Sequence, residues 1–327
     1  MGNRVSVLES RHVALGAGLA DWNDMGVAWT YGTTTDQEHT AVREAAGIID
    51  YSALRKVRVK GPDALATVDY LLPRNMDVVY PGKSGYSTIL NEAGGVADDL
   101  IVYRLAEDHF LLAYGTGECW DLLQKAAAGR DVTIELDDDL YCVSIISRTG
   151  YTGERGYEIY ANADAIINIW DSVVSQGASE GIIPFSFVAL NNCRIEAGLL
   201  FHPFDVSEEQ TPWEAGLGWS IAKEKGDYIG KAACEASKDK ECMIFSGIVA
   251  DAGDAVGEPI AGGEKVLSNG EEVGYLTASI YSKTLNQSIA FAYLKPGVSK
   301  IGTQVEIQGK INCTGTVSQL PFYDPEK

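Results

Sequence analysis

The chain has 327 residues, 46% of them hydrophobic and 9% aromatic, and it carries a formal net charge of -20. This length is sufficient for two or three domains, each with a core of its own. The acidic balance excludes nucleic acid and anionic membranes as partners, and it requires a local positive site for any anionic ligand.

The hydrophobic periodicity predicts both helices and strands along the chain up to Glu241. Helices are expected at Thr35–Ala46, Asp63–Leu72, Trp120–Ala128, Ala165–Ser175 and Ser186–Ala197. Strands are expected at Ile48–Tyr51, Val57–Lys60, Tyr86–Leu90, Val96–Tyr103, Phe110–Tyr114, Val132–Glu135, Cys142–Arg148 and Tyr157–Tyr160.

Local signals indicate where some of these helices begin and end. Thr35 and Glu38 have the spacing of a capping box, and Gly47 is a plausible C-cap for the same helix. Ser186 is a candidate N-cap for the last helix. Before the first helix, Asp21–Gly26 is a turn-rich stretch.

From Glu241 onward the pattern changes to short alternating segments. Turn residues separate them at Asp251–Gly253, Asn269-Gly270 and Pro296-Gly297. This pattern predicts a small all-β domain resembling a barrel. Further upstream, the acids Asp137–Asp139 mark a surface turn and a candidate segment boundary.

The stretch Asn91–Tyr103 sets two carboxylates into an apolar run that follows a glycine turn. Because a strand alternates faces, Asp99, Ile101 and Tyr103 are expected on one side, and Asp98, Leu100 and Val102 on the other. Burying a carboxylate in such a run is costly unless a partner compensates for it. Two interpretations follow: the acids lie at the exposed end of a hairpin, or Asp99 forms part of a pocket wall beside an aromatic ring.

The second glycine-rich stretch, Gly150–Gly156, spaces its glycines three apart. It matches neither the dinucleotide fingerprint nor the P-loop, and by itself it predicts a hairpin turn. No Ser or Cys lies in a nucleophile-elbow motif. What remains is Asp99 near Tyr103, and Glu158 among its neighbouring tyrosines. These side chains suit a flat, polar heterocycle whose ring stacks and whose N–H groups donate to carboxylates.

The cysteines and histidines show no metal-ligand spacing and no C-x-x-C pair, so neither a metal site nor a disulfide framework is expected. The cysteines, expected as buried free thiols, are Cys119, Cys142, Cys193, Cys234, Cys242 and Cys313. No apolar run has the length of a membrane span, and Met1–Ala20 lacks the plan of a signal peptide. A cytoplasmic location is therefore expected.

Taken together, these stretches resemble the T-protein (aminomethyltransferase) family of the glycine cleavage system and its relatives, the tetrahydrofolate-dependent demethylases. The resemblance covers nearly the whole chain, with its motifs in the right order. It is carried by Glu38–Arg43, Asn91–Tyr103, Arg148–Glu158, Arg194–Gly198, Thr211–Trp219, Asp227–Lys231 and Pro321–Tyr323.

The resemblance implies an α+β fold in which three domains form a cloverleaf around a central folate channel. The first domain would be discontinuous and comprise residues 1–55 and 140–238. Residues 56–139 would form the second domain, which carries the Asp99 hairpin. Residues 239–327 would form the C-terminal β-barrel.

The resemblance also places the family's essential catalytic aspartate on Asp99 and implies no metal. The folate contacts are expected at Leu54, Tyr86, Asp99, Ile101, Tyr103, Tyr114, Tyr151 and Glu158. Some positions depart from the family pattern. Leu54 stands where aminomethyltransferases have methionine, Tyr114 where they have asparagine, and Leu190 where they have arginine, and the region Gly129–Cys142 is shortened.

The implied function is that of an enzyme that moves a one-carbon group to N5 of tetrahydrofolate, its co-substrate. We expect a demethylase acting on a small N-, O- or S-methylated donor. The alternative is aminomethyl transfer within glycine cleavage, which requires a lipoylated carrier protein, and the charge of -20 argues mildly against docking an acidic carrier. A second alternative is a folate-binding or regulatory protein without turnover.

Overall fold

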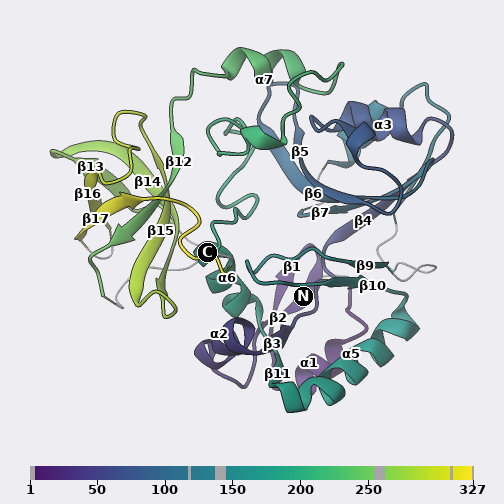
Figure 1. Cartoon of the computed structure of the whole chain (residues 1–327), viewed down its shortest axis with the longest axis horizontal. Coiled ribbons are helices and arrows are strands. Elements are labelled where there is room, and N and C mark those ends of the chain that lie inside the picture. The colour runs from purple at the N-terminus through teal and green to yellow at the C-terminus, as the bar shows by residue number, and fades with distance from the viewer. Residues whose placement is uncertain (1–3, 117–118, 137–144, 254–261, 310–311, 326–327) are drawn as a thin grey trace.

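A computed structural model of the chain describes residues 4–116, 119–136, 145–253, 262–309 and 312–325. The chain forms three lobes, two of mixed helix and strand and one barrel (Figure 1). The α+β class and the C-terminal barrel predicted from the sequence are confirmed. Among the described residues, no helix combines the length and the apolar character needed to cross a membrane.

The first lobe joins the N-terminal segment to elements that follow the second lobe in the chain. Its hairpin turns at Asn23 and Asp24, which both have positive φ, and the sequence predicted only the turn. A short parallel ladder pairs two strands far apart in sequence. The strands are β1 (Gly18–Trp22), β2 (Met25–Thr30), β3 (Ala46–Ile48) and β11 (Ile182–Pro184). The helices are α1 (Glu9–Ala14), α2 (Thr35–Glu44), α5 (Ala163–Gly177), η2 (Ala178–Glu180) and α6 (Phe187–Glu196).

The N-terminus of α2 differs by one residue from the prediction. Thr34, rather than Thr35, is the N-cap, and it forms the capping box with Gln37. Glu38 is buried and accepts a hydrogen bond from the backbone N–H of Ser186, 2.8 Å away. The carboxylate that the sequence assigned to the cap therefore ties α2 to α6.

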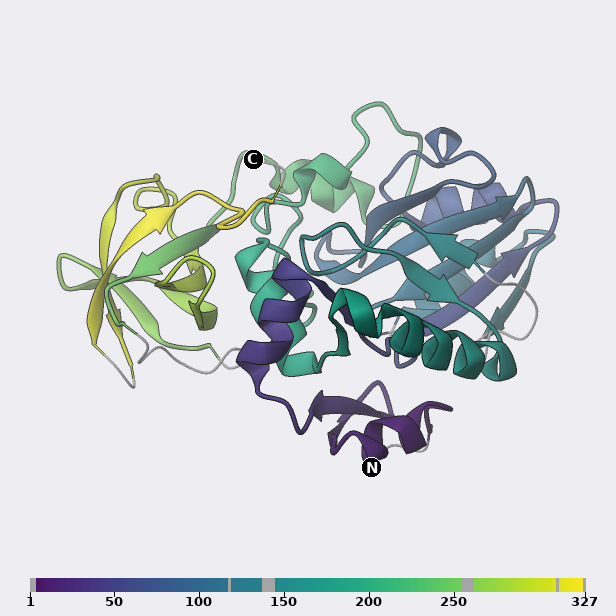
Figure 2. The ribbon, with the colours of Figure 1, turned by 60° about the horizontal axis from the view of Figure 1, so that its bottom comes forward.

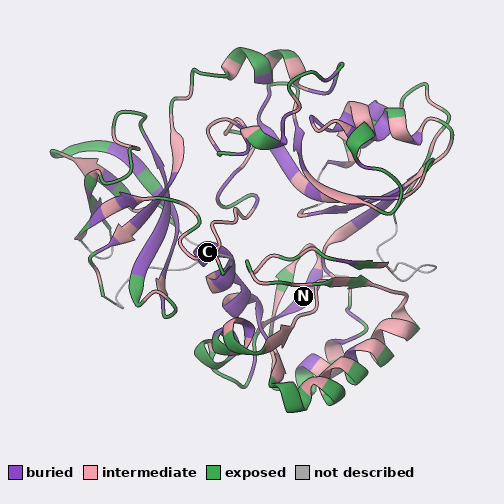
Figure 3. Ribbon diagram, in the orientation of Figure 1, coloured by how far each residue is buried: buried purple, intermediate pink, exposed green. Residues whose placement is uncertain are grey.

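Gly47 is not the C-cap of α2 but part of β3. A Cβ at this position would lie 2.6 Å from side-chain atoms of Phe185 and Val42, so close packing excludes a larger residue. Ser186 caps α6 as predicted, because its hydroxyl accepts a hydrogen bond from the N–H of Ala189. Most of α6 is buried, whereas α5 buries only Trp170 fully (Figure 3).

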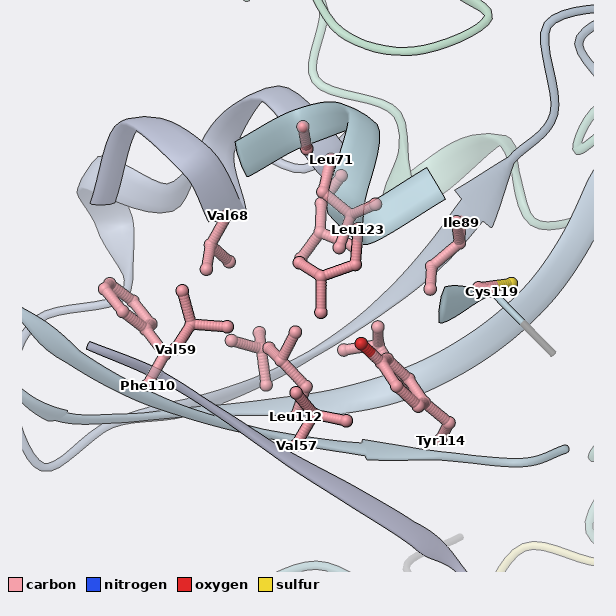
Figure 4. Packing of buried hydrophobic residues seen from close by; sticks show 14 of the residues in the cluster. Val57, Val59, Val68, Leu71, Ile89, Phe110, Leu112, Tyr114, Cys119 and Leu123 are labelled. Carbon is pink, nitrogen blue, oxygen red and sulfur yellow. The ribbon is translucent and has the colours of Figure 1, made fainter. Parts of the chain in front are cut away.

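The second lobe is an antiparallel sheet with the strand order β5-β6-β7-β4-β8. Apolar side chains on one face, such as Val57 and Leu112, point towards Val68 and Leu123 of two covering helices (Figure 4). The strands are β4 (Arg55–Lys60), β5 (Ser84–Leu90), β6 (Val96–Ala106), β7 (His109–Tyr114) and β8 (Thr133–Leu136). The helices are α3 (Ala64–Leu71), η1 (Met76–Val78) and α4 (Trp120–Ala127).

A small hairpin covers part of the opposite face of this sheet. It consists of β9 (Ile145–Ser147) and β10 (Glu158–Tyr160). Ile145 and Tyr160 pack against Tyr103, Leu111 and Ala113 of the sheet. The turn predicted at 137–139 and the first residues of the strand predicted from 142 lie outside the described residues.

The segment 206–234 was assigned to the first domain from the resemblance, but it packs on the second lobe. Val206 and Tyr228 share a cluster with Leu90 and Val96 of the β5–β6 hairpin. The turn of that hairpin is so close to the segment that a Cβ at Gly95 would lie 1.9 Å from the carbonyl oxygen of Glu208. The helical elements here are η3 (Gly218–Ser220) and α7 (Lys231–Ser237).

The third lobe is a closed barrel with the order β12-β15-β14-β13-β16-β17, seen from a second angle in Figure 2. Its strands are β12 (Ile244–Ala250), β13 (Lys265–Ser268), β14 (Glu271–Ser282), β15 (Gln287–Leu294), β16 (Gln304–Gln308) and β17 (Cys313–Ser318). Glu196 at the end of α6 joins the barrel to the first lobe. Its carboxylate accepts hydrogen bonds from Ser282 at 2.6 Å and Arg43 at 2.7 Å.

The cysteine prediction is confirmed in part. Cys119, Cys193 and Cys234 are buried free thiols. Cys242 is a free thiol but exposed, and Cys313 is half-buried, so burial was wrongly expected at both positions. Cys142 lies outside the described residues.

Candidate functional site

The two faces of β6 carry different side chains, as the alternation predicts. Leu100 and Val102 belong to the apolar cluster under α3 and α4. Ile101 and Tyr103 belong to the cluster on the opposite face, beneath β9 and β10. Asp99 lies on this second face, where Tyr86 of the neighbouring strand, paired with Ile101, reaches it.

Asp99 is a half-buried carboxylate beside an aromatic ring. The hydroxyl of Tyr86 donates to its Oδ2 at 3.0 Å. Burial is the main cause that raises the pKa of Asp99 to about 7, and the charge of Asp98 adds to it. Asp98 itself is fully buried. The interpretation that both acids lie at the exposed end of a hairpin is therefore wrong.

A second carboxylate, Glu158 of β10, lies on the same face. Its Oε2 accepts a hydrogen bond from the hydroxyl of Tyr103 at 2.9 Å and another from the hydroxyl of Thr149. The ring of Tyr160 meets that of Tyr103 edge to face, with centroids 5.3 Å apart. Burial, and after it the charge of Glu158, raises the pKa of Tyr103, so its phenol stays protonated and keeps donating.

Two further tyrosines from the first lobe complete this surface. Tyr151 donates to the carbonyl oxygen of Leu200, and burial raises its pKa, with the charge of Asp99 contributing. Burial likewise raises the pKa of Tyr51 well above its ordinary value, and Glu158 contributes. Both side chains nevertheless keep some accessible surface. Protein therefore surrounds most of each ring, although neither ring is fully buried.

One of the predicted folate contacts, Tyr114, lies on the other face of the sheet, and a second, Leu54, stays a prediction. Tyr114 lies on the helix-covered face of the sheet, 1% exposed, where it packs near Cys119 and Ile89 (Figure 4). Its backbone pairs with that of Leu100, which points the same way, so Tyr114 does not reach the face of Asp99. Leu54 is half-buried just before β4, and its carbonyl accepts a hydrogen bond from Nζ of Lys56 at 2.6 Å.

Two residues of this region were not predicted. Trp219, 64% exposed, stacks on Tyr86 with ring centroids 5.3 Å apart. It lies within the motif Thr211–Trp219, and the segment's packing on the second lobe brings it there. Tyr51 follows β3 and meets Trp22 edge to face. A tryptophan at the end of this motif was a usable signal for the first, whereas nothing local distinguishes Tyr51.

The residues on this face suit a flat heterocycle that carries N–H groups. Asp99 and Glu158 offer carboxylate oxygens to ring N–H groups, and the surrounding tyrosines offer apolar faces. Burial strengthens each such hydrogen bond because the local dielectric is low. The structure thus combines a three-lobed α+β fold, a C-terminal barrel and an aromatic face that carries two carboxylates.

Comparison with known proteins identifies the family. The family model described as the GCVT N-terminal domain matches residues 8–145 and 140–225, and the glycine cleavage T-protein C-terminal barrel domain matches residues 245–324. The chain belongs to the glycine cleavage T-protein family, whose members are tetrahydrofolate-dependent aminomethyl- or methyltransferases.

Relatives with different names match nearly the full length of the chain. The heme-dependent oxidative N-demethylase gamma subunit of Ectopseudomonas mendocina is 36% identical, over 99% of this chain and 97% of that protein. The aminomethyltransferase of Streptomyces coelicolor is 31% identical, over 99% and 98%. The crystal structure of aminomethyltransferase T from Bartonella henselae superposes with a TM-score of 0.89 at 26% identity, over 98% of each chain.

Proposed function

We propose that the chain transfers a methyl group from a small methylated donor to N5 of tetrahydrofolate. The observation that carries this proposal is Asp99, a half-buried carboxylate held by Tyr86 with a pKa of about 7. Bound tetrahydrofolate supplies the nucleophilic nitrogen that receives the one-carbon group. The chain's own residues bind and orient it and control charge around it.

Asp99 orients the pterin by accepting its N–H groups and favours positive charge that develops nearby. Because its pKa lies close to neutral pH, its carboxylate can also take up or release a proton. Tyr86 keeps the carboxylate in position. Glu158, held by Tyr103, and the ring of Tyr151 bind the other end of the heterocycle. Ile101 contributes an apolar side chain to the wall of the site, and Trp219 stacks on Tyr86 and shields its outer side.

The donor is best supported as an N-methylated amine. The relative that is 36% identical is named a subunit of an oxidative N-demethylase, whereas the aminomethyltransferases compared are 31% identical. Two carboxylates on one largely buried face also favour a cationic amine over a neutral ether or thioether. Aminomethyl transfer remains the second candidate, because the 31% relatives and the superposed structure carry that name.

A donor screen tests the proposal, with the folate product identified by mass. Formation of 5-methyltetrahydrofolate from a methylated amine supports direct methyl transfer. An oxidative demethylation leaves the carbon at the formaldehyde level, so 5,10-methylenetetrahydrofolate formed without a carrier indicates delivery of an oxidised carbon. The same product formed together with ammonia from a lipoylated carrier supports aminomethyl transfer. If tetrahydrofolate binds but no donor yields a product, the chain is a non-catalytic folate-binding protein.

A further inference from the structure

Next to Asp99 lies a second acid that the proposed function does not use. Asp98 is fully buried, and its carboxylate accepts hydrogen bonds from the N–H of Asp99 at 2.8 Å and from the hydroxyl of Thr116 at 2.9 Å. The register of β5 and β6 shifts between Ile89 and Leu90, just beside it. A bulge of this kind re-aims the neighbouring side chains.

Gly115 is the point on which the two carboxylates converge. A Cβ at this position would lie 3.0 Å from Oδ1 of Asp98 and 3.2 Å from Oδ1 of Asp99. The carbonyl of Gly115 accepts a hydrogen bond from Nδ2 of Asn23 at 2.6 Å, so the turn of the first lobe holds this strand end. Two carboxylates this close oppose each other's ionisation.

His202 lies beside this pair of carboxylates. Its side chain is buried, and its Nδ1 lies 3.7 Å from Oδ1 of Asp98. Three phenols also lie in this region: Tyr86 and Tyr151 interact electrostatically with Asp99, and Tyr114 interacts with Asp98. A protonated imidazole at this place would offset the charge of Asp98 and relieve its effect on Asp99.

We propose that His202 and Asp98 form a buried positioning pair that sets the ionisation of Asp99. The imidazolium of His202 neutralises Asp98, and Asp98 in turn fixes the backbone N–H of Asp99 and the strand end at Thr116. Asp99 is then kept as the carboxylate that accepts hydrogen bonds from the pterin, a consequence that rests on the proposed function. The charge coupling itself does not depend on that function.

The test is a direct titration of the Asp99 carboxyl carbon by NMR, in protein labelled with ¹³C at aspartate. The signal is assigned as the one lost in Asp99→Asn. An opposite charge or a like charge within about 4–6 Å moves a carboxyl pKa by about one unit or more. We therefore expect His202→Gln to raise the midpoint of Asp99 by about one unit and Asp98→Asn to lower it by a similar amount. In the Asp98→Asn background, His202→Gln should shift the midpoint of Asp99 much less than it does in the wild-type chain.

The matched control is His109→Gln, which removes a histidine at the opposite end of β7 and should leave the midpoint unchanged. His202→Asn replaces His202→Gln if the latter does not fold, and melting temperatures establish that each variant is native. A midpoint that stays within about 0.2 units of wild type in both single variants overturns the proposal, as does an equal shift of His202→Gln in the Asp98→Asn background.

Kinetics then separate this proposal from the proposed function. In an active enzyme, the acid limb of kcat/KM should move with the NMR midpoint, while the rate well above that limb stays close to wild type. A purely structural role would lower the rate at every pH. If the midpoints shift as expected but no donor gives a folate product, the pair stands and the proposed function fails.

Discussion

The two faces of the central sheet of the second lobe are built from the same strands but follow different rules. The face under α3 and α4 is almost entirely apolar and fully buried, with Val57, Leu100 and Leu112 among its members. The opposite face carries Asp99, Tyr103 and the half-buried Ile101. On the helix-covered face, what matters is that the side chains are apolar and buried, so one apolar residue can replace another of similar volume. On the opposite face, what matters is which residue occupies each position.

The residues that contribute most to stability and those that we assign to function therefore lie on opposite faces of the same sheet. Removing a side chain from the helix-covered face leaves a cavity and costs folding free energy. Desolvating a carboxylate on the opposite face already costs free energy in the native state, so its removal can stabilise the fold. Truncating an apolar side chain on the helix-covered face and removing the charge of Asp99 on the other face should therefore have opposite effects on the free energy of unfolding.

The largest expected effect is on stability, at Leu112. Leu112→Ala should lower the free energy of unfolding by about 2–5 kcal/mol, because this fully buried side chain leaves a cavity between β7 and the helices. Urea unfolding measures the loss, and the folded fraction should bind tetrahydrofolate as wild type does. Ile101→Ala is the matched variant on the opposite face. It should lose less stability but weaken folate binding, and the reverse ranking would contradict the comparison.

The next largest effect is on turnover, at Asp99. Asp99→Asn should cut turnover by at least about tenfold, or about 1.4 kcal/mol of transition-state stabilisation, because the amide cannot carry the charge that orients the pterin. Steady-state kinetics with the donor found in the screen measure this. The circular dichroism spectrum should be unchanged. Wild-type turnover in this variant would remove Asp99 from the mechanism.

The same variant should be more stable than wild type in alkaline solution. The pKa of Asp99 is raised from 3.8 to about 7 in the native state, so between these values the folded chain binds more protons than the unfolded one. Its contribution to stability therefore falls as pH rises through this window and is lowest above pH 7. Asp99→Asn should raise the free energy of unfolding by about 1–2 kcal/mol at pH 8 and leave it nearly unchanged at pH 4. Melting temperatures at the two pH values measure this, and an equal shift at both would rule out the raised pKa.

The comparison of the two faces also explains which features could be predicted from the sequence. The placement of Ile101 and Tyr103 opposite Leu100 followed from alternation, because β6 is long and its glycine turn fixes its start. The barrel followed from its turn spacing. The capping box of α2 was shifted by one residue, because Thr34 and Thr35 are chemically equivalent candidates.

Features that depend on contacts between distant segments could not be predicted in this way. Trp219 reaches Tyr86 only because the segment 206–234 packs against the β5–β6 turn. His202 meets Asp98 only through the loop after α6. Tyr114 was transferred from a family position without the pairing register, and its pairing with Leu100 turns it to the helix-covered face. A register error of one residue reverses the face of every side chain in a strand.

The smallest expected effect provides the sharpest test of this last point, because it compares two tyrosines that each lose only a hydroxyl. The hydroxyl of Tyr114 is buried and has no hydrogen-bond partner among the described residues, so Tyr114→Phe should leave folate affinity unchanged and stability equal or slightly higher. The hydroxyl of Tyr86 donates to Asp99 and lowers its pKa. Tyr86→Phe should therefore raise the pKa of Asp99 and weaken tetrahydrofolate binding by roughly three- to tenfold, or about 0.6–1.4 kcal/mol. Fluorescence titration with tetrahydrofolate measures both. Equal losses in the two variants would place Tyr114 at the ligand and contradict the assignment of the two faces.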